Sequence, residues 1–452
     1  MIIYKIALGL IGLGVVVFVH ELGHFIAARL MGIAVEAFSI GWGKPILKKK
    51  IGEVEYRLGL FPLGGYCKMK GENEFEEAYK NDRQGVIAEE GSYFAAHPFR
   101  RAVTCVAGPL FNIIFAILVL SVIWGIGFEV TTRSNRIVLL SDIVSGSVNP
   151  ADIAGLKTGD RILEIKGKKI EDYHDIQENI ALNPEAALPL IVERQGRILE
   201  LVVRPSLEKS TGAGKIGIYD WTDPVIAQVT EGSPAAIAGL QSGDRILTVN
   251  GGDFPYTVAL ISILDKNPRE LDLEYERNGR IMQGRLPLSY TENGIETLGI
   301  MWELVNYRTP RLSPPFALAK GSAETWKTFA VSVKSLSLLF RGIDLTQAVS
   351  GPVRITYMVG DVAAEGFNQS FGTGISSMAS FLALISIALC IMNLLPLPVL
   401  DGGMIILFLI EGLRRKPLHP RFISAFQTVG VVLIAGLMLF AVFGDILYLA
   451  KR

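Results

Sequence analysis

The sequence predicts a polytopic α-helical membrane protein with four spans and two tandem β-rich domains inserted between spans two and three. Four apolar segments, at about 6–28, 102–127, 378–398 and 424–443, each have about the 20 residues that a spanning helix needs. About 250 residues of mixed composition separate the second segment from the third, and they contain an internal repeat. Hydrophobic residues make up 50% of the 452-residue chain and charged residues 19%, which places it on the apolar side of soluble proteins.

The first apolar segment has the length of a secretory signal, but it runs directly into His20-Glu21-Leu22-Gly23-His24 and stays apolar beyond it. A cleaved signal would not usually carry such a cluster, so we predict that the segment is retained as span one. The 44 basic and 44 acidic residues balance to zero net charge, which gives no reason to expect a nucleic-acid partner. The three cysteines do not suggest a disulfide framework.

Basic residues predict the orientation of the spans. Twelve Lys and Arg lie in residues 29–101 and four in residues 411–421, and short loops rich in these residues stay in the cytoplasm. With four spans, both termini and the large region between spans two and three would then lie outside the cytoplasm. For a bacterial cell this means a multi-pass inner-membrane protein with its inserted domains in the periplasm.

The inserted region contains two copies of one pattern, 84 residues apart. Residues 153–163 read IAGLKTGDRIL and residues 237–247 read IAGLQSGDRIL. Gly-Asp has turn chemistry and Arg-Ile-Leu alternates into a strand, so each copy predicts a small β-rich module. The pattern resembles the signature of bacterial PDZ domains, which implies binding of an extended peptide or a chain terminus at a sheet edge. The alternative is that the two modules are structural spacers.

The expected domains are a membrane half at 1–127, PDZ-like domains at 128–221 and 222–308, an amphipathic linker region outside the cytoplasm at 309–375, and a second membrane half at 376–452. Within the linker, residues 315–340 have helical spacing of apolar residues interrupted by lysines. This helix could lie on the outer membrane surface or pack against the inserted domains.

A candidate metal site lies in span one. His20 and His24 are one helical turn apart, so both imidazoles can reach one ion, and Glu21 points to the side where a water would sit. Catalytic zinc uses three protein ligands and an open position, with a carboxylate as base. Ionisable groups within a span cost roughly 2.5–3.5 kcal/mol on insertion scales and are functional by default. The alternative is a structural cluster that bonds neighbouring helices.

The third ligand is expected in another span at similar depth. Of the four candidates Glu129, Asp401, Glu411 and Asp445, only Asp401 follows two prolines and precedes two glycines, which break the helix and let a carboxylate turn inward. Glu411 neighbours Arg414 and Arg415, which indicates an interfacial, solvated residue. His20 lies about 12 Å from the cytoplasmic end of its span at 1.5 Å per residue, and Asp401 lies near the same end of span three.

His-Glu-x-x-His in span one, together with Asn393-x-x-Pro396-x-Pro398-x-Leu-Asp401-Gly in span three, resembles the paired signature of the site-2 protease family of intramembrane metalloproteases. With two PDZ-like domains between spans two and three, the chain is similar to the bacterial type that regulates sigma-E. The resemblance implies that His20, His24 and Asp401 bind zinc, that Glu21 is the general base, and that Asn393, Pro396 and Pro398 face the substrate.

Two further segments fit this family. Residues 51–70 resemble its re-entrant β-hairpin, which helps to hold the substrate as an extended strand. Gly108-Pro109-x-x-Asn112 in span two also matches, with a small-residue helix contact and a direct substrate role both open.

The resemblance implies hydrolysis of peptide bonds inside the transmembrane segments of single-span proteins in the bilayer, such as an anti-sigma factor or a leftover signal peptide, by a monomeric enzyme. The PDZ-like pair would filter substrates by size or capture new chain ends. Rival interpretations are a membrane-anchored protease acting on soluble proteins, a PDZ scaffold and a metal transporter. The first predicts the metal motif outside the apolar span, and a transporter would need a chain of intramembrane polar sites where the sequence has one cluster.

Overall fold

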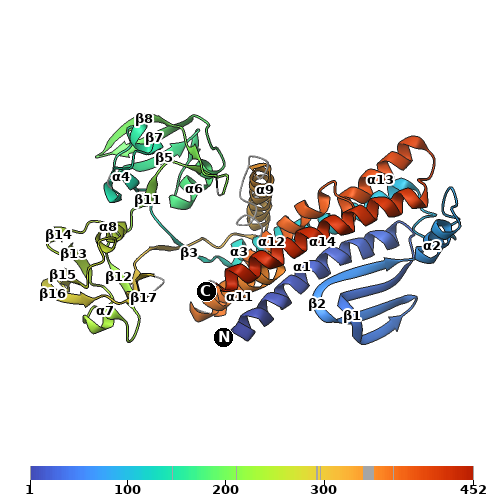
Figure 1. Cartoon of the computed structure of the whole chain (residues 1–452), viewed down its shortest axis with the longest axis horizontal. Helices are drawn as coiled ribbons and strands as arrows, with labels where there is room; N and C mark the ends of the chain where they lie inside the picture. The colour runs from blue at the N-terminus through green and yellow to red at the C-terminus, as the bar shows by residue number, and fades with distance from the viewer. Residues whose placement is uncertain are drawn as a thin grey trace. The chain divides into compact units, whose positions relative to one another are not determined.

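The computed structural model describes residues 2–144, 146–209, 211–291, 294–295, 297–338, 351–369 and 371–450. The chain forms two compact units. The first unit, which is mainly helical, comprises the residues up to Phe128, Thr309–Ser337 and the described residues after 350. The second unit is built around Glu129–Arg308 and is rich in short strands. Figure 1 colours both units along the chain.

The helices of the first unit are α1 (Ile2–Leu30), α2 (Glu72–Lys80), α3 (Pro98–Ile126), α9 (Pro314–Leu338), α11 (Pro352–Gln369), α12 (Phe371–Leu394), α13 (Asp401–Arg414) and α14 (Pro420–Ala450). Four segments in the described part of the chain are long and apolar enough to cross a membrane: Ile6–Leu30, Pro98–Ile126, Phe371–Leu394 and Pro420–Asp445. Only 11% of the most apolar stretch of α14 is buried within the protein, so its other side chains are suited to contact with lipid.

Proline and its neighbours explain two helix boundaries. Helix α3 begins with Pro98, and proline is tolerated there because backbone N–H groups in the first turn of a helix form no intrahelical hydrogen bond. The ring of His97 caps the helix by accepting a 3.2 Å hydrogen bond from the Phe99 N–H. Helix α12 ends at Leu394, earlier than the apolar run that was expected to reach residue 398. Pro396 and Pro398 cannot continue a helix, so residues 395–400 form an irregular connection to α13.

A bent sheet lies beside α1 (Figure 1) and is formed by β1 (Val35–Ile51) and β2 (Val54–Met69). The first part of β1, residues 37–40, pairs on one side with residues 65–68 and on the other with residues 55–58. The segment expected to form the hairpin, residues 51–70, therefore supplies only half of the sheet, namely β2 and the turn at Gly52-Glu53. The other half is β1, which begins at Val35. In the described pairing, residues 65–69 form an edge of this sheet.

The second unit contains the two sequence repeats as two similar groups of elements. The first comprises β3 (Glu129–Thr132), β4 (Ile137–Leu139), α4 (Leu140–Ile143), α5 (Pro150–Ile153), β5 (Arg161–Ile165), β6 (Lys168–Lys169), α6 (Tyr173–Ala181), β7 (Leu188–Arg194), β8 (Arg197–Val203), β9 (Ser206–Leu207), β10 (Gly214–Lys215) and β11 (Ile218–Asp220). The second comprises β12 (Ile226–Val229), α7 (Pro234–Ile237), β13 (Arg245–Val249), β14 (Gly252–Asp253), η1 (Thr257–Ala259), α8 (Leu260–Leu264), β15 (Glu270–Arg277), β16 (Arg280–Pro287), β17 (Tyr290–Thr291), β18 (Gly294–Ile295), β19 (Ile300–Trp302) and β20 (Val305–Arg308).

The main sheets of the two groups have the same strand order, β6-β5-β7-β8 in the first and β14-β13-β15-β16 in the second. Each group encloses its own core of buried aliphatic side chains, around Ile162 and Leu190 in the first and around Ile246 and Leu271 in the second. Strand β3 pairs with β20, so the chain enters and leaves this unit at adjacent strands. The repeated sequence thus folds twice into the same supersecondary arrangement.

The aspartate of each repeated Gly-Asp pair is buried and bonded in the same way in both copies. Asp160 accepts two hydrogen bonds of 2.7 Å from Arg194, and Asp244 accepts two of 2.7 Å from Arg277. Each aspartate also accepts a backbone N–H at 2.8 Å from the residue three positions earlier. Each arginine also donates a hydrogen bond to the carbonyl of the first glycine of the same repeat, Gly155 in the first copy and Gly239 in the second. The turn that begins each repeat is therefore fastened to the main sheet.

Arg277→Met is expected to destabilise the second repeat by about 3–5 kcal/mol, because it leaves Asp244 fully buried without its charged partner. Arg280→Met, on the adjoining strand and exposed, should change stability by less than about 0.5 kcal/mol. Hydrogen exchange of the β13 and β15 amides in the detergent-solubilised protein measures both. Equal protection in the two variants would contradict the role given to this ion pair.

The helix expected at residues 315–340 is α9, and it packs on the apolar helices of the first unit. Glu324 accepts a 2.7 Å hydrogen bond from the Trp124 indole of α3, and the Lys320 ammonium lies 4.8 Å from the same ring. Phe329 and Leu336 contact the buried side chains shared by α3 and α12. Helix α11 similarly packs against α1 and α12. The described parts of residues 309–375 are therefore helices of the first unit, and residues 339–350 and 370 lie outside the described chain.

Candidate metal centre

Helix α1 places His20 and His24 on one buried face. Their side chains point to the same side because they are four residues apart, and the residues are 7% and 8% exposed. Their Nε2 atoms are 3.1 Å apart. Helix α3 can approach this face because its contact residue is Gly108, where any side chain would overlap both imidazoles. Gly23 on α1 meets the same stretch of α3, so two small residues allow the close approach.

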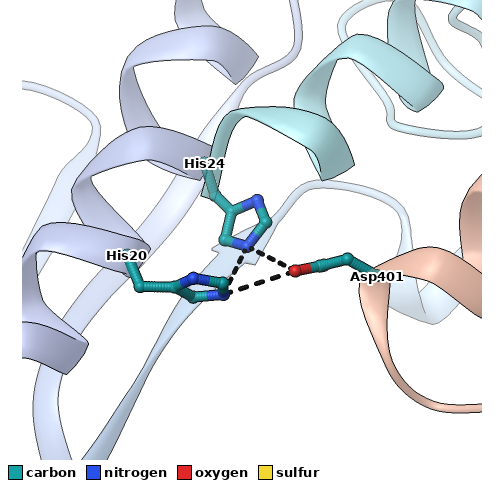
Figure 2. Close-up of side chains that lie close together, drawn as sticks. All are labelled: His20, His24 and Asp401. Atoms are coloured by element: carbon teal, nitrogen blue, oxygen red, sulfur yellow. Dashed lines mark hydrogen bonds and ion pairs between the residues drawn. The ribbon is translucent and has the colours of Figure 1, made fainter. Parts of the chain in front are cut away.

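Asp401, at the first position of α13, completes the group. Its Oδ2 atom lies 3.3 Å from Nε2 of His20 and 3.5 Å from Nε2 of His24. Figure 2 shows the three side chains converging from α1 and α13. Gly402 and Gly403 permit this placement, since a side chain at either would overlap the backbone carbonyls of the preceding loop. The helix break predicted from the prolines and glycines therefore precedes the carboxylate in the cluster.

The triangle of three ligand atoms fits a zinc ion. Tetrahedral zinc holds nitrogen and oxygen ligands at about 2.0–2.2 Å, which separates neighbouring ligand atoms by about 3.3–3.5 Å. The separations of 3.3 and 3.5 Å lie in this range, and that of 3.1 Å between the two imidazoles is slightly shorter. Among the described residues, Oδ2 of Asp401 is a buried oxygen without a hydrogen-bond donor. A buried carboxylate that converges with two imidazoles and lacks a donor is well suited to a cation.

Comparisons with known proteins agree with this geometry. The model of "Peptidase family M50" matches residues 8–437. The chain belongs to peptidase family M50. A putative zinc metalloprotease of Treponema pallidum is 38% identical over 446 residues, covering 98% of this chain and 99% of the relative. The regulator of sigma E protease of Haemophilus influenzae is 32% identical (97% and 98% covered), and RseP of Escherichia coli is 31% identical (98% of each chain).

Membership of family M50 confirms the predicted resemblance to site-2 proteases and the predicted enzyme class, a metallopeptidase. The names of the relatives also agree with zinc as the expected cofactor. Four apolar helices are consistent with a membrane protein of this family.

Glu21 lies between the triangle of His20, His24 and Asp401 and the edge of the β1–β2 sheet. It is close enough to His20, His24 and Asp401 to interact with their charges, and it faces the backbone N–H of Cys67 on β2. A side chain at Gly65 would touch the Glu21 side chain. The carboxylate is therefore adjacent to the proposed ligands and beside the strand edge at residues 65–69.

The three residues expected to face the substrate lie at or after the end of α12. Asn393 is half-buried in the last turn of the helix, Pro396 is exposed in the connection, and Pro398 packs against Gly430 of α14. The contact of Pro398 with α14 gives it a structural role that the sequence pattern did not reveal. Val399 has φ 76°, a conformation that costs a β-branched residue about 1–3 kcal/mol and that often occurs at functional sites.

Glu411 is not the solvated interfacial residue that its neighbours Arg414 and Arg415 suggested. It is 8% exposed and accepts a 2.7 Å hydrogen bond from Arg101, whose guanidinium lies 4.8 Å from the Phe408 ring. The expectation was wrong because the partner of Glu411 comes from α3, 310 residues away in sequence. This buried ion pair fastens the helix that carries Asp401 to the helix that contacts both histidines.

Proposed function

We propose that this chain is an intramembrane zinc metalloprotease that hydrolyses peptide bonds within the transmembrane segments of single-span membrane proteins. The observation that carries the proposal is the triangle of His20, His24 and Asp401, formed by a helix apolar enough to cross a membrane and by a carboxylate that follows a second such helix. Relatives named regulators of sigma E protease support anti-sigma-factor substrates, with leftover signal peptides as a second class.

Zinc held by these residues would polarise the peptide carbonyl and make a water molecule more acidic. Glu21 is positioned to take the proton of the attacking water and to give it to the departing amine, as a general base and then a general acid. The histidines and Asp401 keep the reacting groups in one buried place. Asn393 and Pro396 would contact the substrate at the entrance formed by the α12–α13 connection.

A helical substrate hides its carbonyls in hydrogen bonds, so it must unwind before it can be cut. The sheet edge at residues 65–69 can accept an added strand and hold the unwound segment beside Glu21. The two repeats between spans two and three have the sequence signature of PDZ domains, and we propose that they admit trimmed substrates or capture their new ends.

The proposal predicts a selective cleavage pattern for the purified protein in detergent. A spanning peptide with helix-breaking residues should be cut, an otherwise identical poly-leucine helix should be cut much more slowly, and a chelator should stop both reactions. An unfolded soluble protein such as casein serves as the control for a merely membrane-anchored protease. Cleavage of casein without cleavage of the spanning peptides would contradict the intramembrane proposal.

We also propose that the termini and the second unit lie on the periplasmic side of a bacterial inner membrane, from the basic residues in the 29–101 and 411–421 loops. A reporter that is active only outside the cytoplasm should be active when fused near Gly212 and silent near Asn73. The reverse pattern would overturn the orientation without affecting the chemistry of the site.

A further inference from the structure

Asn112 of α3 is a fully buried polar residue that belongs to the Gly108-Pro109-x-x-Asn112 motif. Its side chain lies against the ring of His20, with Nδ2 3.2 Å from Nδ1. The residue is 0% exposed, which argues against direct contact with a substrate. The small-residue contact of the motif is made by Gly108 itself, so neither role left open by the sequence explains why an amide is placed here.

The partner of His24 shows what a proposed ligand histidine needs. Nδ1 of His24 lies 2.8 Å from the backbone carbonyl oxygen of Thr104. A carbonyl oxygen can only accept, so Nδ1 of His24 carries the proton and its Nε2 keeps a lone pair for the metal. Ligand histidines usually have such a partner, which fixes both the tautomer and the orientation of the ring.

His20 needs the same tautomer, because its Nε2 also points into the triangle. An amide N–H donated to Nδ1 would instead require a proton on Nε2, and a protonated Nε2 cannot bind a metal. The other end of the Asn112 amide, Oδ1, is a buried oxygen without a hydrogen-bond partner among the described residues. The two ends of an amide are nearly equal in size, so a half-turn about χ2 places Oδ1 opposite Nδ1 of His20.

We propose that Asn112 is a positioning residue of the metal centre, whose Oδ1 accepts a hydrogen bond from Nδ1–H of His20 and holds Nε2 ready for zinc. The inference rests on the proposed metal site. Helix α3 then orients both histidines: the backbone carbonyl of Thr104 orients His24, and the side-chain amide of Asn112 orients His20. One helix that supplies no metal ligand thus sets the tautomer of both histidines.

Three variants of the full chain in detergent test the inference through the zinc dissociation constant, measured by competition with a chromophoric chelator. Asn112→Leu keeps the size and removes the acceptor, and it should weaken zinc binding about 10–100-fold. Asn112→Asp keeps an acceptor at the same place and should bind zinc as tightly as the wild type or more tightly. Ser386→Ala is the matched control, since the Ser386 hydroxyl is equally buried and bonds only the backbone carbonyl of Asn112 among the described contacts.

The outcomes separate this inference from the proposed function. A wild-type protein that does not bind one zinc ion would contradict the metal site itself. Stoichiometric zinc in the wild type, with equal affinity in Asn112→Leu, would overturn only the role of Asn112. The same conclusion would follow if the Asp and Leu variants were equally weakened, because packing and not the acceptor would then matter. If the Leu variant fails to fold, Asn112→Asp decides alone, and zinc binding more than about tenfold weaker than the wild type would refute the proposal.

Discussion

Glu21→Gln is expected to lower peptide-bond cleavage by at least about 10²–10⁴-fold while leaving the zinc content unchanged. The substitution removes the proposed proton transfer, which requires a carboxylate at this position, and keeps the size of the side chain. The proposed ligands His20, His24 and Asp401 are untouched, and their atoms form the zinc-sized triangle without any contribution from Glu21. Activity and metal content should therefore separate in this variant.

The measurement pairs a cleavage assay on a spanning peptide with metal analysis of the same preparation. Glu53→Gln, at the exposed turn between β1 and β2, is the matched control and should change neither quantity. Loss of zinc together with activity in Glu21→Gln would make Glu21 a ligand. Retention of both would show that another group takes the proton.

The cluster of the candidate metal centre could be predicted from the sequence because its signals are local. The spacing of His20 and His24 fixes their common face on a helix, and the prolines and glycines around Asp401 indicate a helix break. The depth of each residue in its span then suggests that the two segments meet. The structure brings these three residues together. Their role as zinc ligands and the substrate roles of Asn393, Pro396 and Pro398 stay predictions.

Other features depend on partners that are distant in sequence. The two neighbouring arginines predicted an interfacial position for Glu411, and only the folded chain shows that its partner is Arg101. The first half of the β1–β2 sheet was missed because Lys48, Lys49 and Lys50 interrupt any apolar alternation, although residues 37–40 form its centre. The partner of α9 was likewise undecided, because a helix with apolar and basic residues can lie on the outer membrane surface or pack against the inserted domains. Its observed partners, α3 and α12, were not among the alternatives.

Asp401→Asn is expected to remove zinc from the protein and to abolish cleavage. An amide oxygen is a much poorer ligand than a carboxylate for a divalent ion, and two histidines alone leave the site one ligand short. The fold should survive, because the variant removes a buried carboxylate oxygen that, among the described residues, has no hydrogen-bond donor of its own. The thermal stability of the zinc-free variant should therefore equal or exceed that of the zinc-free wild type.

Glu411→Gln is the matched comparison, since it makes the same carboxylate-to-amide change ten residues later on the same helix. It leaves Arg101 buried beside a neutral partner, and breaking such a pair costs about 3–5 kcal/mol, so its melting temperature should fall while the folded fraction keeps its zinc. Metal analysis and thermal unfolding of both variants, with and without chelator, measure the two effects. The expected results are opposite: Asp401→Asn loses zinc and keeps the stability of the zinc-free wild type, and Glu411→Gln loses stability without losing zinc. Normal zinc content in Asp401→Asn would mean that the third ligand lies elsewhere, and the intramembrane protease would then lack the active site proposed for it.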